Sequence, residues 1–434
     1  MDATQWDALL PGQADANPFM RHAYLAALHE SGAALPKTGW TPRFITLWRG
    51  AAMVAACALY VKAHSYGEYV FDHAWANAYF QHGLNYYPKA LVAVPFTPVP
   101  GARLLARTQA DRVALVQGLI VWCGEEKLSS LHLLFASDDD VAACASSGLM
   151  LRHTVQFHWK NSNAGFLSFD DFLASLSQEK RKKIRQERRK VADAGVTFRW
   201  SLGADIASAD WDFFYRCYER TYLEHGNAPY LSRDFFQRMA DTMPQNWLLF
   251  VAHREGHPVA ASLIAITGIA ADPTAAGPIN SDGPVAMTVA TKSIANYSYK
   301  TLENVTIDHP NRSDDAIVPL PAANERLAQT GRTANRVAYG RYWGALERVD
   351  CLHFEACYYQ PLQWCIEHGY QRFEGGAQGE HKMARALMPV KTSSAHWLAQ
   401  PAFADAVERF LEREGQGIDH YMADLSLRSP FKPA

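Results

Sequence analysis

Apolar positions alternate between helix-like and strand-like spacing along residues 1–165. Apolar runs on both sides of residues 49–51 predict a β-hairpin, and a continuous apolar run from Leu91 ends at the prolines that follow Phe96. The spacing predicts helices at 19–29, 111–126 and 138–147, and strands at 43–48, 53–60, 91–96, 131–135 and 154–159. Because helices and strands are mixed throughout, the predicted fold class is α/β or α+β.

The same succession of elements returns after Gly195, where two strands are again followed by a helix and a further strand. The pattern predicts strands at 196–200, 247–253, 259–266, 336–343 and 370–374, and helices at 211–223, 234–242, 354–368, 381–387 and 403–414. The repeat indicates an N-terminal domain at 1–165 and a C-terminal domain at 195–434. Residues 267–334 interrupt the second one, and their richness in Ala, Thr, Pro, Asn and Asp predicts a long, mobile insertion.

Basic side chains dominate the segment between the two domains. It has no Gly or Pro from a capping-box-like start at Ser168 to Gly195, which predicts one helix of about seven turns. Eight of the twelve residues 179–190 are Lys or Arg and two are Glu, which makes the local net charge +6. The stripe left to contact the domains is narrow: Leu173, Leu176, Ile184, Val191 and Ala194. We therefore expect a basic connecting helix at 166–194 that projects from the domains.

Charge and composition limit where the protein works. The whole chain has a net charge of only −2, so residues outside 179–190 carry −8, and attraction to phosphate groups is confined to the basic helix. The longest apolar run, 51–61, is too short to span a membrane, and the acidic N-terminus is unlike a secretory signal. Seven cysteines without a CxxC pair favour a reducing compartment, so we expect a cytoplasmic protein.

Residues 373–389, FEGGAQGEHKMARALMP, hold one of two concentrations of reactive groups. Glycines after a predicted strand let the backbone approach a ligand closely, and Glu380, His381 and Lys382 then begin a predicted helix. This order is typical of an anion or carboxylate site with an adjacent acid–base group. A glycine-rich connection with a capping Glu and a solvated Lys explains it equally well. No G-x-G-x-x-G or Walker pattern points to a nucleotide.

The second concentration is CLHFEACYYQ at 351–360. His353, Glu355 and Cys357 share one face of a strand, whereas on a helix only His353 and Cys357 do. Without H-E-x-x-H or paired cysteines a zinc site is not favoured, and Cys357 is better explained as a core residue than as a nucleophile. Glu355, placed near a strand end and facing the loop at 379–382, is the better candidate for taking a proton from an attacking amine.

Several long segments resemble the FemAB-like branch of the GNAT-type acyltransferases, a family associated with peptidoglycan biosynthesis or recognition. The matching segments are 82–105, 168–191, YGRYWG at 339–344, 352–360, 373–389 and 394–398. The resemblance implies two GNAT-like (acyl-CoA N-acyltransferase) domains in tandem. Fem ligases carry a helical arm and transfer amino acids from aminoacyl-tRNA to the peptide of a peptidoglycan precursor. The R/Q-x-x-G-x-G/A loop with which GNAT enzymes hold coenzyme A follows neither central strand.

These observations predict an acyltransferase that joins an activated acyl or aminoacyl group to an amine. The donor is either aminoacyl-tRNA or acyl-CoA, and the acceptor amine belongs to a peptidoglycan precursor, with peripheral contact to a lipid-linked form. Two alternatives stay open: a CoA-dependent N-acyltransferase acting on a small molecule, and a non-catalytic module that recognises RNA or a cell-wall precursor.

Each predicted site residue has an expected role. Glu355 or Glu380 is the base, His381 the alternate proton carrier, and Lys382 holds a phosphate or stabilises the oxyanion. Substrate contacts are expected from Tyr342, Trp343, His353, Tyr358, Glu374 and Gln378 in the C-terminal cleft, and from Trp75 and Lys89 on a second surface, where an aromatic run is otherwise typical of a core. The bases expected to bind phosphate or RNA are Lys180, Arg181, Lys182, Arg185, Arg188 and Arg189. No metal site is expected.

Overall fold

A computed structural model describes residues 2–13, 15–162, 164–267, 285–290, 299–302, 336–377 and 379–432. Its first half contains α1 (Ala3–Asp7), α2 (His22–Glu30), β1 (Trp40–Arg49), β2 (Ala52–Lys62), α3 (His73–Gln81), β3 (Lys89–Val92), β4 (Leu104–Ala106), α4 (Gln109–Glu125), β5 (Ser130–Ala136), α5 (Asp138–Ser146) and β6 (Met150–Lys160). Two helices, α6 (Phe169–Ser175) and α7 (Gln178–Asp193), then lead to the second half.

The second half begins with β7 (Val196–Leu202), α8 (Ser208–Glu224), α9 (Arg233–Thr242), β8 (Trp247–Arg254) and β9 (His257–Ile266). It continues with β10 (Ala286–Ala290), β11 (Tyr299–Leu302), β12 (Val337–Ala345), α10 (Leu352–Phe354), the π-helical turn η6 (Glu355–Tyr359), α11 (Gln360–Glu367), β13 (Arg372–Glu374), the 3₁₀ helix η7 (Glu380–Arg385), β14 (Met388–Leu398) and α12 (Pro401–Leu427). None of the helices in the described ranges is both long and apolar enough to cross a lipid bilayer.

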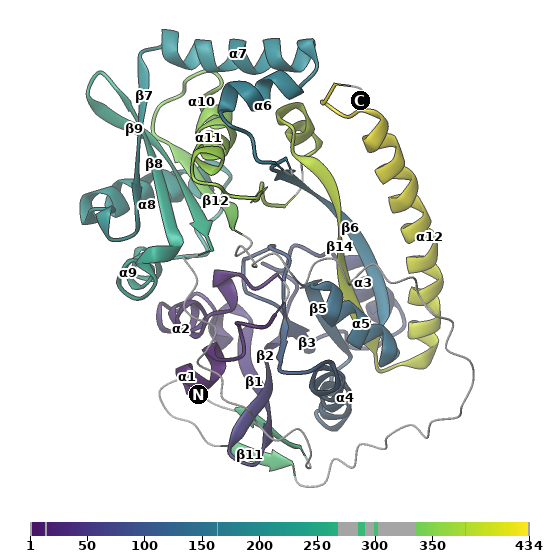
Figure 1. Cartoon of the computed structure of the whole chain (residues 1–434). Coiled ribbons are helices and arrows are strands. Elements are labelled where there is room, and N and C mark those ends of the chain that lie inside the picture. Colours follow the sequence, from purple (N-terminus) through teal and green to yellow (C-terminus); the bar gives the residue numbers. More distant parts are fainter. Residues whose placement is uncertain are drawn as a thin grey trace.

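The described strands form one sheet of fourteen, in the order β11-β10-β1-β2-β3-β5-β14-β6-β13-β12-β9-β8-β7, with β4 paired to β2 (Figure 1). A hairpin, a parallel pair and a helix between the paired strands occur in each half: β1–β2 with β3, α4 and β5, and β8–β9 with β12, α10–α11 and β13. The mixed α/β class and the repeat predicted from the sequence are therefore confirmed.

The two halves exchange a strand at the centre of the sheet. β14, from the C-terminal part of the chain, lies between β5 and β6, where Ala395 pairs with Leu133 on one side and with Leu151 on the other. β6, from the N-terminal part, also pairs with β13 of the second half. The sheet thus continues across the domain boundary predicted at residue 165. One apolar core, including Tyr24 and Tyr342, spans both halves on one face of the sheet.

The sequence reading of the basic segment differs from the structure in two ways. The segment forms two helices, because Leu176 is extended and fully buried, and because Ser177 donates its backbone N–H to Pro430 O of the C-terminal tail. α7 also does not project: it lies along the second half, next to α6 and α10 (Figure 1). It buries Ile184, Glu187 and Val191 against the domain.

An ion pair anchors α7. The Glu187 carboxylate accepts hydrogen bonds from Arg385 Nη2, at 3.0 Å to each oxygen, and from the Tyr359 hydroxyl. Arg385 is 3% exposed and also stacks over Phe354. Glu187, the buried one of the two acids in this basic segment, therefore anchors α7 to the second half.

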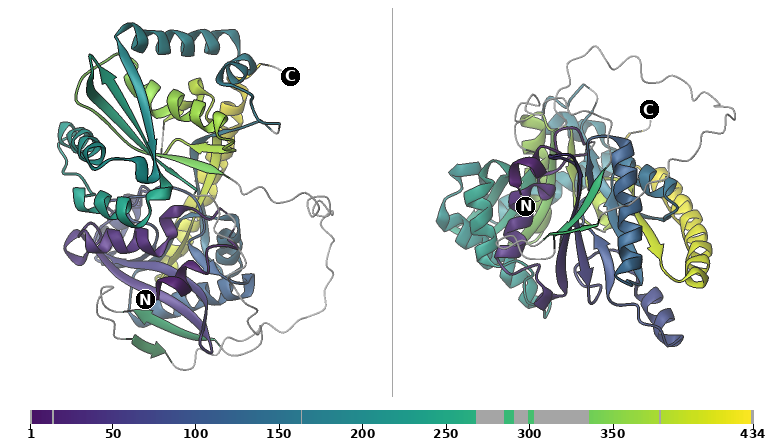
Figure 2. Two further views of the ribbon diagram at one scale, coloured as in Figure 1. Left: turned by 60° about the vertical axis from the view of Figure 1, so that its left-hand side comes forward. Right: turned by 90° about the horizontal axis from the view of Figure 1, so that it is seen from below.

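Two pieces of the insertion predicted at 267–334 lie within the described residues, and both are strands. β10 pairs with β1 in antiparallel register, Thr288 opposite Thr46, and β11 pairs with β10 (Figure 2). Met287 and Val289 are buried against the first half. These short pieces therefore extend the sheet at β1.

Replacing the anchoring acid of α7 tests its docking. We expect Glu187→Gln to lower the free energy of unfolding by about 3 kcal/mol, because it leaves the buried Arg385 guanidinium without its counter-charge. Glu179→Gln, on the exposed side of the same helix, is the matched control and is expected to change it by less than about 0.5 kcal/mol. Urea denaturation of both variants measures the difference, and equal effects would contradict the docking role.

Candidate functional site

An opening in the sheet lies where the parallel strands β12 and β13 part. They pair only from Val337 to Tyr339, opposite Arg372 to Glu374, after which β13 ends and β12 continues to Ala345. Two cavities adjoin the opening and share Gly340, Arg341, Tyr342 and Gly375 in their walls, one of about 130 Å³ and one of about 250 Å³. The gap between β12 and β13 is the part of the second half in which a ligand can approach the strand backbone.

Four of the predicted substrate residues line the smaller cavity: Tyr342, Trp343, His353 and Tyr358. The His353 ring lies 5.4 Å from the Trp343 ring and 5.8 Å from the Tyr358 ring, measured between centroids. His381 joins this group through its Nε2, 3.5 Å from the Tyr358 hydroxyl oxygen. The structure thus brings together residues from β12, from the helix after it and from the loop after β13.

The histidines of this group are held neutral. Although part of the His353 side chain reaches the surface, loss of water around the ring lowers its pKa, and the neighbouring His381 and Arg385 lower it further. Partial burial, together with Lys382 and Arg385, also lowers the pKa of His381. Both imidazoles are therefore uncharged at neutral pH and each has a nitrogen that can accept a proton.

Lys382 closes the glycine-rich loop instead of facing a cavity. Its Nζ donates hydrogen bonds to Gly376 O at 3.0 Å and Ala377 O at 3.1 Å, and the side chain is 3% exposed. Burial lowers the pKa of Lys382 to about 8. Gly376, at φ 78°, and Gly379, at φ 118°, give the loop its left-handed turns. Gln378, a predicted substrate contact, lies outside the described residues.

Glu374 lies under the opening at the end of β13, and it faces away from both cavities. The carboxylate pairs with Arg372 Nε at 3.0 Å and lies 3.9 Å from His158 Nε2. Burial raises the pKa of Glu374 to about 7, against the opposing effect of Arg372. Its position supports the strand end and does not place it beside a bound substrate.

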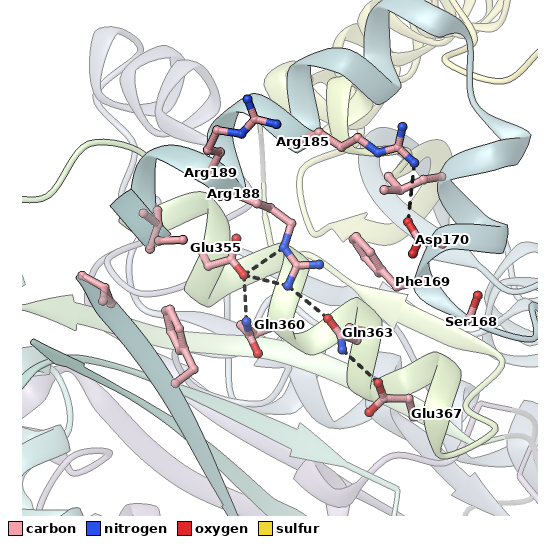
Figure 3. A pocket seen from close by; sticks show the side chains of 15 residues that line it. Ser168, Phe169, Asp170, Arg185, Arg188, Arg189, Glu355, Gln360, Gln363 and Glu367 are labelled. Carbon is pink, nitrogen blue, oxygen red and sulfur yellow. Dashed lines mark hydrogen bonds and ion pairs between the residues drawn. The ribbon is translucent and has the colours of Figure 1, made fainter. Parts of the chain in front are cut away.

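Glu355 is separated from the histidines. Residues 352–359 are helical, so His353 and Cys357 share a face and Glu355 points the other way, toward α7. Its Oε1 accepts hydrogen bonds from Arg188 Nε at 3.1 Å and Gln360 Nε2 at 2.7 Å, and its buried Oε2 has no hydrogen-bond partner in the described structure (Figure 3). The expectation that it faces the loop at 379–382 is not met.

Glu380 also lies apart from the cavities beside the gap. It is paired with Arg428, the residue that follows α12, and accepts a hydrogen bond from the Tyr421 hydroxyl of α12 at 3.2 Å. The carboxylate is about half exposed and adjoins a different cavity, between β6 and α12. Neither glutamate predicted as the base therefore lies beside the gap between β12 and β13.

Trp75 and Lys89 belong to the interior of the first half. Lys89 is fully buried and pairs with Glu68 at 2.7 Å and with Asp72. Trp75 is 6% exposed and stacks on His132 at 5.9 Å between centroids. The recognition surface predicted around these residues is thus a core cluster.

Three of the predicted phosphate-binding bases line a cavity of about 690 Å³ between α6, α7 and the helix after β12 (Figure 3). Arg188 is held by Glu355 and by Gln363 Oε1 at 3.0 Å, and its guanidinium stacks over Phe169. Arg185 lies 3.5 Å from Asp170 at the rim, and Arg189 also lines the cavity. The other predicted bases, Lys180, Arg181 and Lys182, extend along α7 with partial or full exposure.

Comparison with known proteins identifies the family. Residues 1–270 and 326–433 match the FemAB-like family, described as peptidoglycan biosynthesis/recognition. The chain belongs to this family. The resemblance inferred from the sequence is confirmed, and the stretch that the match leaves out falls within the insertion at 267–334. None of the curated proteins compared with the chain matches it.

Solved structures with a similar arrangement include FemX, with 10% identity, a TM-score of 0.47 and coverage of 94% of this chain and 98% of that one. Another is L-PGS from Bacillus licheniformis, with 10% identity, a TM-score of 0.47 and coverage of 94% and 97%. A third is a tandem GNAT protein from the clavulanic acid biosynthesis pathway, with 12% identity, a TM-score of 0.35 and coverage of 90% and 98%. Similarity at these levels carries no argument about activity.

Arg341 is a residue of this FemAB-like site to which the sequence assigns no role. It lines both cavities beside the gap and donates a hydrogen bond from Nη2 to Phe96 O at 2.9 Å, so it also touches the first half. The one sequence feature that could have pointed to Arg341 is its position as a lone arginine within the aromatic strand motif YGRYWG. A strand pattern says nothing about which cavity such a side chain enters.

The raised pKa of Glu374 predicts a pH dependence of stability. Its pKa is about 7 in the folded protein against 4.5 for an ordinary Glu, so between these values the folded state binds more protons and stability falls as pH rises. At about 1.4 kcal/mol per pKa unit, wild type should lose about 3 kcal/mol relative to Glu374→Gln from pH 4.5 to 7.

Urea denaturation at pH 4.5, 5.5, 6.5 and 7.5 measures this loss. The exposed Glu408→Gln on α12 is the control, and its stability is expected to follow that of wild type across this range. A constant difference between Glu374→Gln and wild type would contradict the raised pKa.

Proposed function

We propose that this FemAB-like protein is an acyltransferase that joins an activated acyl group, namely an aminoacyl group, to an amine in the gap between β12 and β13. The observation that carries the proposal is the parting of the two strands after three paired residues, with His353 and Tyr358 in the wall of the smaller cavity and His381 next to the Tyr358 hydroxyl. In the described structure no strand covers that edge of β12 from Gly340 to Ala345. The Trp343 carbonyl accepts a hydrogen bond from the Thr221 hydroxyl, and the backbone groups before it can bind an extended acyl chain.

The proposed chemistry is transfer between two nucleophiles. The acceptor amine attacks the acyl carbonyl carbon, a C–N bond forms, and the bond to the donor oxygen or sulfur breaks. A neutral imidazole takes the proton that the amine loses and returns it to the leaving group. His381 suits this task best, because its Nε2 lies beside the Tyr358 hydroxyl and its side chain reaches the surface. Lys382 keeps the loop that carries His381 closed.

The donor in this proposal carries phosphate. Arg185, Arg188 and Arg189 of α7 line the 690 Å³ cavity. The helical segment after β12 lies between this cavity and the gap, because His353 and Tyr358 face the gap and Glu355 faces the cavity. Aminoacyl-tRNA is favoured over acyl-CoA, because several exposed bases follow one helix and no R/Q-x-x-G-x-G/A loop follows either central strand. The family description favours an acceptor from peptidoglycan synthesis. The proposal extends to a lipid-linked form of that precursor and to a reaction on the cytoplasmic side, which the cysteine pattern favours.

Thermal stability in the presence of candidate donors tests this assignment. Charged and uncharged tRNA are expected to raise the melting temperature at low salt, whereas acetyl-CoA and longer acyl-CoAs are not. Replacing Lys182, Arg185 and Arg189 together with Glu should abolish the tRNA effect, because each lost base removes phosphate neutralisation. The control replaces the exposed Arg409 and Arg413 of α12 with Glu. Stabilisation by acyl-CoA alone would favour a CoA-dependent N-acyltransferase and overturn the aminoacyl assignment.

Turnover separates an enzyme from a recognition module. With a donor and acceptor that give product, His381→Asn should lower kcat by a factor of about 10²–10⁴, the usual contribution of a general base. Glu380→Gln, one residue away but paired with Arg428, should leave kcat within about twofold. Initial rates of product formation provide the measurement. Binding of both substrates without product would establish a recognition module instead.

A further inference from the structure

The larger cavity beside the gap, of about 250 Å³, is built by both halves of the molecule. Tyr69 and Phe96 come from the first half, Tyr218 and Tyr222 from α8, and Arg341 from β12. No Asp or Glu lines it within the described ranges, and Arg341 is its one charged residue there. The cavity is thus a small aromatic chamber with a single positive charge.

The Arg341 guanidinium has too few partners for its position. Nη2 donates to Phe96 O, Nε has no hydrogen-bond partner, and the Tyr342 hydroxyl is close enough to interact with the guanidinium. Its planar face packs against Phe19 and Tyr342, with the guanidinium carbon 5.4 Å and 5.1 Å from their ring centroids. Arg341 is thus partly buried among aromatic side chains, and no carboxylate of the described residues acts as its counter-charge.

Three arginines that are more deeply buried than Arg341 each have a carboxylate or several backbone carbonyls as partners. Arg385 has the carboxylate of Glu187, and Arg112 has that of Asp140 at 3.2 Å. Arg103 donates to three backbone carbonyls, those of Leu134, Gly101 and Val99. Arg341 differs from these three in having one carbonyl partner and no carboxylate, and it lines the chamber.

The tyrosines complete an anion site. Burial raises the pKa values of Tyr218 and Tyr222, so both phenols stay protonated at neutral pH and can donate hydrogen bonds. Tyr218 accepts one from the Leu231 backbone N–H at 3.3 Å and interacts through its own hydroxyl with Tyr222, which leaves the Tyr222 proton to donate. A negatively charged ligand would meet the Arg341 guanidinium and neutral tyrosine hydroxyl donors, with no acid in the described lining to repel it.

We propose that this chamber binds a carboxylate, and that Arg341 selects acyl acceptors that carry a free carboxylate near the reacting amine, such as an amino acid or a peptide end. A carboxylate fits better than a phosphate, because the chamber offers a single guanidinium, whereas phosphate groups meet several bases along α7. The walls shared with the smaller cavity place the bound carboxylate next to the gap. Binding in the chamber is independent of the proposed function, whereas the acceptor role rests on it.

Matched pairs of small probes test the binding. L-lysine is compared with 1,5-diaminopentane, and alanyl-alanine with its C-terminal amide, by isothermal titration calorimetry on the full chain. At least one acid should bind at least tenfold more tightly than its partner without the carboxylate, and inorganic phosphate should not compete with it. Equal affinity within both pairs, no binding of either acid at 10 mM, or displacement by phosphate would each overturn the proposal.

Variants assign the effect to Arg341. Arg341→Met should abolish acid binding, and Arg341→Lys should retain part of it, because the charge remains and the fork is lost. Tyr222→Phe, which keeps the charge, should weaken binding severalfold and serves if Arg341→Met does not fold, as judged by circular dichroism. Arg43→Met is the control: this half-buried arginine of β1 has one backbone carbonyl partner and lies away from the chamber. Unchanged acid binding in folded Arg341→Met or in Tyr222→Phe would overturn the assignment.

Turnover distinguishes the two proposals. If acids bind as expected but no donor yields product, carboxylate binding in the chamber is supported and the acyltransferase proposal fails. If transfer proceeds with equal kcat/KM to amines with and without a carboxylate, the enzyme assignment stands and the acceptor role of Arg341 fails.

Discussion

The pairing of β14 between β5 and β6 is the constraint on which the rest of the structure depends. Each half of a repeated α/β arrangement ends with a parallel pair of strands, and here each half completes its sheet with a strand from the other. Separating the halves would therefore leave unpaired backbone groups on β5, β6 and β13, at a high cost in free energy. The shared sheet fixes the position of one half relative to the other. Tyr69 and Phe96 of the first half can therefore line the same chamber as Arg341 of the second.

The strand exchange also explains where the gap lies. β13 is short because the chain must turn after Glu374, pass through the loop held by Lys382 and return as β14. That turn opens the sheet between β12 and β13 and carries His381 to the opening. The loop thus serves the fold and the proposed site at once, and the glycines with left-handed backbone are placed where the chain reverses most sharply.

The charges on α7 are distributed so that most of its basic side chains remain exposed and can contact a phosphate-bearing ligand. The single buried acid, Glu187, docks the helix by pairing with Arg385 from the loop region, while most of the Lys and Arg side chains of α7 point away from the domain. The net charge of −2 conceals this segregation. A phosphate-bearing donor would meet a fixed row of positive charge beside the gap, without the entropic cost of ordering a projecting arm.

Particular residues show how far sequence patterns reach. The spacing at 336–343 and 370–374 predicts both strands of the gap, and Tyr342, Trp343, His353 and Tyr358 do gather there. The spacing predicts a helix at 354–368, but only the structure begins it at Leu352, which puts His353 and Cys357 on one face and Glu355 on the other. β14 was not predicted at all, because its pairing partners lie far away in the chain and its apolar pattern is broken by polar residues such as Lys391 and Ser393.

The sequence by itself determined the local matters: the mixed α/β class, the repeat of elements, the concentration of positive charge at 179–190 and the family. These follow from periodicity, composition and contiguous motifs, which act over a few residues at a time. Only the tertiary structure decided that α7 docks, that the halves exchange strands, and that Arg341 enters a chamber without a counter-charge. The physical reason is that burial and ion pairing depend on which distant side chains meet, and Glu187 with Arg385, or Arg341 with Phe96, are joined only by the folded sheet.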